Sequence, residues 1–211
     1  MSRLPSAVRQ LLAGLRGLLI FTAICGILYP LVVYGIGQAA FNKQANGSIV
    51  HFHGRVVGSS LLCQEFIATK GNPLAQYFQP RASASATSAT NQTGGCNPLA
   101  SGASNLGPNN STLVQDINAR QKQISAFDHV PVSAIPPDAV TASASGLDPY
   151  ISPQYAAIQV NRVAAARHIS PAAVKALVTK YTFGRQFGFL GEPGVNVLLV
   201  NLALDERHPV P

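Results

Sequence analysis

The hydrophobic positions of the chain include one long uncharged run near its start. Between Gly17 and Asn42 no residue carries a charge. As a helix, this run spans about 39 Å, which exceeds the hydrocarbon core of a bilayer, about 30 Å thick. A cleaved signal peptide has a shorter apolar core. The pattern therefore predicts a retained transmembrane helix over residues 17–42, preceded by a tail of residues 1–16.

Proline and glycine interrupt this predicted helix. Pro30 removes a backbone donor and is expected to kink the helix. Gly26, Gly35 and Gly37 would allow another helix to approach closely. Glycine and proline are also simply more common in membrane helices than in soluble ones. Of these two interpretations we favour packing against a helix of another membrane subunit.

Small and polar residues dominate the next part of the chain, roughly 70–110. The stretch Arg81–Thr93 has low complexity and resembles a flexible linker. However, large apolar side chains lie just before it and require burial: Leu74, Tyr77 and Phe78. We therefore expect a structured, loop-rich lobe whose tip is mobile.

Three later stretches carry helix signals. The first is Ser111–Phe127, with Ser111 as its cap and apolar residues at near-helical spacing. Ser152-Pro153 and Ser170-Pro171 each place a capping hydroxyl before a proline. They predict helices to about Arg167 and to about Phe183. We interpret these two as a helical hairpin that covers a sheet, and not as a DNA-binding helix-turn-helix.

Two apolar stretches predict strands. Val56–Leu62 is short and interrupted by Gly58, and Val195–Leu204 has the continuous apolar character of a central strand. Helices and strands together predict the α+β class. The expected architecture is a single N-terminal transmembrane helix, then one exported, loop-rich mixed α/β domain over residues 43–211.

The distribution of charge predicts an orientation. The net charge is +7, and Arg3, Arg9 and Arg16 precede the apolar run while only Lys43 follows it closely. The positive-inside rule then places the N-terminus in the cytoplasm and residues 43–211 outside it. The remaining basic residues are scattered singly, so the sequence does not predict nucleic-acid binding.

Motifs for catalysis are missing from the sequence. It contains no G-x-S-x-G, no G-x-x-x-x-G-K-[ST] and no G-x-G-x-x-G. His51 and His53 could begin a metal site, but no further ligand follows at a suitable spacing, and we interpret them as surface residues. Cys63 and Cys96 could pair only if their segment is exported and their backbones lie close.

One stretch, Val140–Pro153, combines small hydroxyl residues with a glycine. Ser143, Ser145 and Gly146 could cradle a phosphate, or could form an ordinary tight loop. An exported loop would not meet cytoplasmic ATP, which favours the tight loop. Alanine–serine motifs of this kind recur at 82–86, 100–104 and 142–146, which suggests close-packing loops.

Several segments together resemble a known family, the C subunit of the Kdp potassium-transporting P-type ATPase of bacteria and archaea. The resemblance covers nearly the whole chain and is carried by QANGS (44–48), VVGSSLLCQEF (56–66), YFQPRASA (77–84), NPLASGASNLGP (97–108), VTASASGLDPYISPQYA (140–156) and GEPGVNVLLVNLALDE (191–206).

The resemblance implies an accessory subunit of a high-affinity potassium uptake pump in the cell membrane. Its partners would be a channel-like potassium-binding subunit, a P-type ATPase catalytic subunit, a small membrane subunit and the lipid bilayer. The chain lacks the D-K-T-G motif, so the phosphorylation chemistry would belong to another subunit.

The family is also described as a catalytic chaperone that raises the ATPase subunit's affinity for ATP. ATP is thus the only cofactor implied, with Ser143, Ser145 and Gly146 as the residues that could contact it. One alternative is a domain that gates or shields the potassium entrance without any nucleotide role. Another is a membrane-anchored exported enzyme or binding protein.

Overall fold

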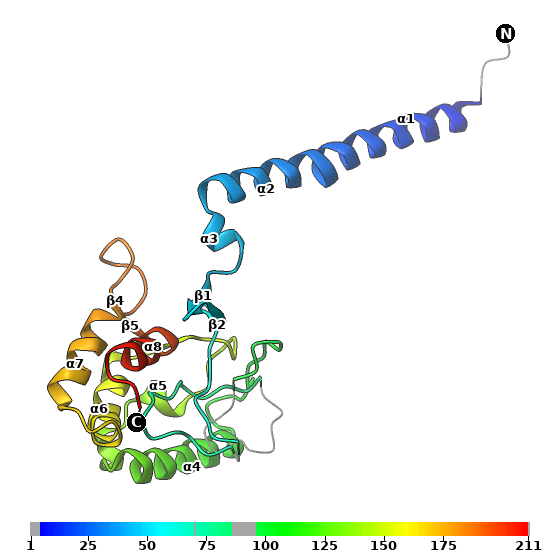
Figure 1. Cartoon of the computed structure of the whole chain (residues 1–211). Coiled ribbons are helices and arrows are strands. Elements are labelled where there is room, and N and C mark those ends of the chain that lie inside the picture. The colour runs from blue at the N-terminus through cyan, green and yellow to red at the C-terminus, as the bar shows by residue number, and fades with distance from the viewer. Residues whose placement is uncertain (1–4, 70, 86–95, 211) are drawn as a thin grey trace. The chain divides into compact units, whose positions relative to one another are not determined.

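A computed structural model describes residues 5–69, 71–85 and 96–210 of the chain (Figure 1). The chain forms two compact units, which divide between Ser48 and Ile49. The tip predicted to be mobile falls largely on residues 86–95 and lies outside the described residues.

The first unit is an apolar helix of 35 residues, Ser6–Ala40, long and apolar enough to cross a membrane. It consists of α1 (Ser6–Phe21), a π-helical segment (Thr22–Leu28) and α2 (Tyr29–Ala40). The short helix α3 (Asn42–Ala45) follows. The helix begins well before residue 17, because residues 6–16 are mostly good helix formers that extend it.

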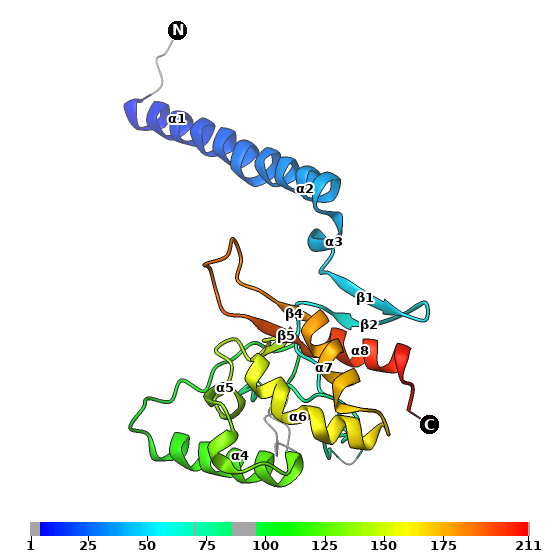
Figure 2. The same ribbon diagram turned by 90° about the vertical axis from the view of Figure 1, so that its left-hand side faces the viewer.

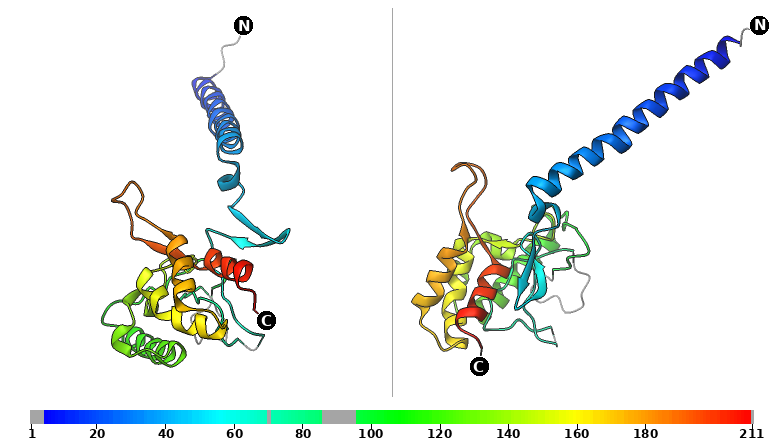
Figure 3. Two further views of the ribbon diagram at one scale, coloured as in Figure 1. Left: turned by 60° about the vertical axis from the view of Figure 1, so that its left-hand side comes forward. Right: turned by 45° about the horizontal axis from the view of Figure 1, so that its top comes forward.

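The distortion predicted at Pro30 takes the form of the π-helical segment Thr22–Leu28, just before it. Proline donates no hydrogen bond, and its ring crowds the carbonyl four residues earlier, that of Gly26. A wider turn relieves this contact. Figure 3 shows that the helix continues through the distortion.

Arg9 and Arg16, two of the three residues behind the predicted orientation, lie on α1, and Arg3 lies outside the described residues. The domain limits 1–16, 17–42 and 43–211 and the orientation stay predictions.

Two small antiparallel sheets form part of the second unit. β1 (Ile49–Phe52) and β2 (Arg55–Ser59) make a hairpin whose register shifts between Val50 and His51. The other sheet has the order β3–β5–β4, with β3 at Tyr150–Ile151, β5 at Gly194–Asn196 and β4 at Thr182–Phe183. The strand predicted over Val56–Leu62 ends at Ser59, where the chain turns and the amide of Leu62 donates to the Ser59 carbonyl.

The strand predicted over Val195–Leu204 is wrong for most of its length. Only Gly194–Asn196 is a strand, and Val197–Arg207 forms helix α8. The Asn196 side chain caps this helix by accepting a hydrogen bond from the amide of Leu199, 3.0 Å away. A helix that is buried on most sides is as continuously apolar as a central strand, so periodicity alone could not separate the two.

The predicted helices are confirmed with two corrections. α4 spans Ser111–Asp128, but its cap is the Asn110 side chain and not Ser111. α6 spans Pro153–Ala166, and α7 spans Pro171–Lys180 and ends before Phe183. α7 ends early because Thr182–Phe183 forms strand β4, which pairs with β5.

Ser152 and Ser170 cap α6 and α7 as predicted, because each side chain accepts an amide hydrogen bond from the first turn. The two helices pack side by side as a hairpin beside the three-stranded sheet, while α4 packs on α6 (Figure 2). Shorter turns complete the unit: a 3₁₀ turn at Val132–Ala134 and α5 at Pro137–Val140.

The core contains an irregular segment, residues 75–79, between α6 and α8. Phe78 is fully buried, and its amide and carbonyl bond the Asn201 side chain at 2.8 and 2.9 Å. The backbone of Gln79 bonds the Gln159 side chain in the same way. Side chains therefore satisfy the buried backbone groups that a neighbouring strand would satisfy in a sheet. The burial predicted for Leu74, Tyr77 and Phe78 is complete for Phe78 and partial for Leu74 and Tyr77.

Candidate functional site

Three small-residue segments that are distant in the sequence meet at one place: 82–85, 100–102 and 142–146. The amide of Ser143 donates to the Ala82 carbonyl at 2.9 Å. The Ser145 carbonyl accepts from the amide of Gly102 and from the hydroxyl of Ser101, both at 2.9 Å. We call this meeting point the small-residue junction. The recurring alanine–serine motifs of the sequence thus pack against one another.

The residues predicted as a phosphate cradle lie in this junction. The Ser143 hydroxyl accepts from the amide of Gly146 at 3.1 Å. The carbonyl of Gly146 accepts from the hydroxyls of Ser83 at 2.8 Å and of Ser85 at 3.2 Å. The Ser145 hydroxyl accepts a hydrogen bond from the amide of Leu147 at 3.1 Å. These contacts within the chain favour the tight-loop interpretation, and phosphate binding here stays a prediction.

Position 146 requires a glycine for two reasons, the conformation of its backbone and the closeness of its neighbours. Its φ is +73°, where side chains other than that of glycine are disfavoured. A Cβ atom would lie 2.7 Å from the carbonyl oxygen of Gly102 and 2.7 Å from the Cβ of Ser85. The loop can approach the other two segments so closely only because residue 146 has no side chain.

A disulfide lies beside the junction and joins Cys63 to Cys96, whose Cα atoms are 6.0 Å apart. The amide of Cys63 donates to the carbonyl of Leu147 at 2.9 Å, which connects the disulfide to the 142–146 loop. Burial raises the pKa of the nearby Glu65 carboxyl, while a hydrogen bond from the backbone of Cys96 acts in the opposite direction. The sequence left open whether Cys63 and Cys96 pair, and in the structure they do.

The disulfide predicts the thiol count of the protein purified from membranes. After denaturation without reductant, only Cys25 should react with an alkylating mass tag, and after reduction three thiols should react. In the control variant Cys63→Ser, two thiols should react without reductant. Three reactive thiols in the unreduced natural protein would contradict the pairing and would argue against an oxidising location.

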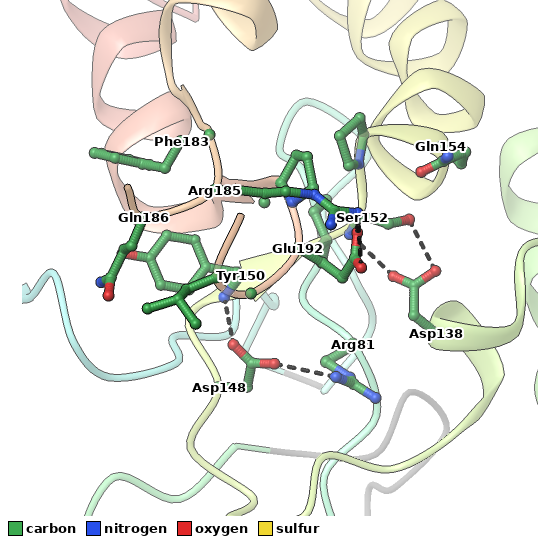
Figure 4. Close-up of a pocket in the computed structure, with 17 residues that line it drawn as sticks. Arg81, Asp138, Asp148, Tyr150, Ser152, Gln154, Phe183, Arg185, Gln186 and Glu192 are labelled. Carbon is green, nitrogen blue, oxygen red and sulfur yellow. Dashed lines mark hydrogen bonds and ion pairs between the residues drawn. The ribbon is translucent and has the colours of Figure 1, made fainter. Parts of the chain in front are cut away.

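A cleft of about 1010 Å³ is lined in part by the end of the 140–153 stretch, from Asp148 to Pro153 (Figure 4). Asp148 pairs with Arg81 at 3.1 Å and accepts from the amide of Tyr150 at 3.0 Å. Asp138 accepts from the amide and the hydroxyl of Ser152, at 3.0 and 2.8 Å. These carboxylates therefore fix the entry into β3 and the start of α6.

The far wall of the cleft is the β4–β5 connection, where Arg185 bonds both oxygens of Glu192, at 2.9 and 2.7 Å. Most charges around the cleft are thus paired, which suits positioning of loops better than acid–base chemistry. The sequence did not reveal this grouping, because its members lie far apart in the chain and no motif connects them.

Within residues 5–69, 71–85 and 96–210, no group of three or more histidine, cysteine, aspartate or glutamate residues is arranged to hold a metal ion. His51 and His53 lie at the β1–β2 hairpin and border a small hollow together with Glu206. Both histidines are exposed, in agreement with the interpretation as surface residues.

Two buried arginines that the sequence did not single out donate hydrogen bonds to the irregular segment 75–79: Arg162 to the carbonyls of Ala75 and Tyr77, and Arg167 to that of Gln76. Arg162 pairs with Asp128 at 2.7 Å, and Arg167 pairs with Asp205 at 2.7 Å. Burial raises the pKa of Asp128, and the guanidinium of Arg162 opposes this effect. A useful signal was available, since Arg162 on α6 and Arg167 directly after it are the only charged residues of Pro153–Arg167, and a buried unpaired charge would be costly.

Comparisons with known proteins find similarity over most of the chain. Residues 11–206 match the family described as "KdpC: K+-transporting ATPase, c chain". A "Potassium-transporting ATPase KdpC subunit" of Paraburkholderia phytofirmans is 48% identical over 187 residues, which cover 89% of this chain and 91% of the relative. The proteins of the same name from Kineococcus radiotolerans and Geobacter sulfurreducens are 46% and 45% identical. These matches cover 98% and 96% of this chain, and 98% and 100% of the relatives.

Proposed function

Because the chain belongs to the KdpC family of K+-transporting ATPase subunits, we propose that it is a non-catalytic accessory subunit needed for assembly of a potassium uptake pump. Its partners in this proposal are the channel-like potassium-binding subunit, the P-type ATPase catalytic subunit and the small membrane subunit. Hydrolysis of ATP is assigned to the catalytic subunit, since this chain lacks D-K-T-G.

The observation that carries the proposal is the apolar helix Ser6–Ala40, of which no residue in the most apolar window is buried. Such a surface requires lipid or a partner helix around it. A Cβ added at Gly35 would meet no atom within 4 Å, and one at Gly26 would meet only the methyl group of Thr22, at 3.8 Å. Gly26, Pro30 and Gly37 lie on one face of the helix, which is the proposed packing face for another membrane subunit, whereas Gly35, two residues before Gly37, lies on the opposite side.

The proposed location is the cell membrane, with the N-terminus in the cytoplasm and the domain from residue 43 onward outside. Arg3, Arg9 and Arg16 support this orientation through the positive-inside rule. The disulfide between Cys63 and Cys96 supports it independently, because disulfides form in oxidising compartments.

Two alternatives concern the role of the subunit within the complex. One is modulation of the ATP affinity of the catalytic subunit, for which Ser143, Ser145 and Gly146 are the candidates. The contacts of these residues within the small-residue junction favour a structural role instead. The other is gating or shielding of the potassium entrance by the exported domain, which needs no nucleotide.

Leucine substitutions in the anchor test the assembly role. Gly26→Leu combined with Gly37→Leu should reduce co-purification of the channel-like subunit about tenfold, which corresponds to a loss of about 1.4 kcal/mol of helix packing. The matched control is Gly17→Leu combined with Gly35→Leu, which also adds two side chains where no atom lies within 4 Å, but away from the proposed packing face.

Equal co-purification of the double variant and the control would contradict packing through these glycines. A second pair of variants, Ser143→Ala and Ser145→Ala, separates the roles. A changed apparent affinity for ATP with normal assembly would favour the nucleotide-related alternative over the assembly role.

A further inference from the structure

The connection between β4 and β5 exposes large apolar side chains at its end. It stands out from the body of the domain in every view (Figures 1, 2 and 3). We call residues 186–190 the hairpin tip. Within it, Phe187 is 86%, Phe189 69% and Leu190 47% exposed. Monomeric soluble proteins rarely expose such neighbouring apolar groups, and contiguous patches of this kind mark interaction sites.

The backbone of the hairpin tip forms its own hydrogen bonds. Gln186 and Leu190 exchange two bonds, both 2.9 Å long. The amide of Gly188 donates to the Arg185 carbonyl at 3.2 Å, and the amide of Phe189 donates to the Gln186 carbonyl at 3.3 Å. Four of its amides are thus satisfied without water. This property is needed wherever a backbone enters an apolar medium.

The tip also carries no unpaired charge. Residues 184–191 contain one ionisable side chain, that of Arg185. Its positive charge is balanced by the carboxylate of Glu192, to which it donates two hydrogen bonds. Immersion in a medium of low dielectric constant would therefore leave no isolated charge without water. In addition, phenylalanine and leucine offer no polar group for specific recognition by a protein. Tyrosine, tryptophan and arginine, which are enriched at the energetic centres of protein interfaces, do not occur in residues 186–190.

A lipid surface is always near this domain if the apolar helix is an anchor. Only residues 41–48 separate the end of α2 from β1, and they span at most about 28 Å. A domain of the size of Ile49–Pro211 has a radius of gyration of about 15 Å. The tether therefore holds the domain at a high effective concentration against the bilayer, so that even a weak apolar contact becomes populated.

We propose that the hairpin tip, through Phe187, Phe189 and Leu190, inserts into the lipid–water interface of the bilayer that holds the chain's own anchor. The proposal rests on the membrane anchoring proposed above. It assigns the tip a function of its own, which is to fix the exported domain against the lipid surface at a second point besides the anchor.

Tryptophan fluorescence tests the insertion, because the natural chain contains no tryptophan. The full chain is reconstituted into lipid nanodiscs as the single-tryptophan variants Phe187→Trp and Phe189→Trp. The expected result is emission at shorter wavelength than in water, and quenching by lipids brominated on their acyl chains. Leu99→Trp is the matched control, since Leu99 is 95% exposed and directly precedes segment 100–102 of the small-residue junction. Its emission should resemble that in water and should not be quenched.

A second control, Leu28→Trp, reports on the anchor alone. If Leu28→Trp is quenched while the two tip variants emit as in water, the insertion is wrong and the anchoring stands. If the tip variants shift to shorter wavelength only in the co-purified pump and brominated lipid does not quench them, the tip docks on a protein and the lipid proposal is wrong. Absence of quenching at Leu28→Trp would overturn the anchoring and the insertion together.

Discussion

Replacing Arg162 with methionine is expected to lower the free energy of unfolding of the domain Ile49–Pro211 by about 4 kcal/mol. The Arg162 guanidinium donates to Asp128 at 2.7 Å, to the carbonyls of Ala75 and Tyr77 at 2.6 and 2.9 Å, and to Gln159 at 2.7 Å. Methionine fills similar space but leaves the buried Asp128 carboxylate and two partly buried carbonyls without these partners. Denaturant unfolding of the full chain in detergent, followed by circular dichroism, measures the change.

The destabilisation should depend on pH in a defined direction. Burial already raises the pKa of Asp128, and loss of Arg162 removes the charge that opposes this effect. A carboxyl whose pKa is higher in the folded than in the unfolded state stabilises the fold fully only below its unfolded pKa, about 4. That contribution disappears as the pH rises through the folded pKa. The deficit of Arg162→Met should therefore be smaller near pH 4 than at pH 7.

Two comparisons isolate this effect. Arg185→Met removes the exposed pair with Glu192 and should cost less than about 0.5 kcal/mol. The double variant Arg162→Met, Asp128→Asn should be more stable at pH 7 than Arg162→Met alone, since no buried charge remains unpaired. A loss at Arg162 no larger than that at Arg185 would refute a central role for this arginine.

Alanine at Gly146 is the second change with a large expected effect, a loss of about 3 kcal/mol of unfolding free energy. Part of the loss comes from the backbone, because alanine at a φ of +73° is strained. The rest comes from the two contacts of 2.7 Å that its Cβ would make with Gly102 and Ser85. Relief of these contacts would require the small-residue junction to open.

Gly54→Ala separates the two contributions. Gly54 has a φ of +75°, nearly that of Gly146, but a Cβ there would meet no atom within 4 Å. This variant should therefore show the backbone term alone, about 1 kcal/mol. If the two alanine variants unfold at the same denaturant concentration, the close approach at the junction contributes nothing to stability.

The elements that were predicted correctly are those with strong local signals. The long uncharged run predicted the apolar helix, and the Ser-Pro pairs at 152 and 170 predicted the starts of α6 and α7. Each signal depends on neighbouring residues only. The family resemblance, which depends on whole motifs, was likewise confirmed by the match over residues 11–206.

What the sequence could not predict depends on contacts between distant residues. The helix α8 was mistaken for a strand, since burial on several sides removes the helical period from its hydrophobic pattern. The three segments of the small-residue junction were visible as repeats, but the repeats did not show that they meet. In the same way, the positions of Arg81, Asp138 and Asp148 along the chain gave no indication of a shared cleft.

The irregular segment 75–79 has a consequence for the order in which the domain Ile49–Pro211 folds. Its partners come much later in the chain: Gln159 follows Gln79 by 80 positions, and Asn201 follows Phe78 by 123. Contacts of such long range form slowly, because a large loop must close before they contribute. During synthesis, the backbone of residues 75–79 therefore stays hydrated until α8 has been made. Because α8 comes so late in the chain, its packing completes the centre of the domain.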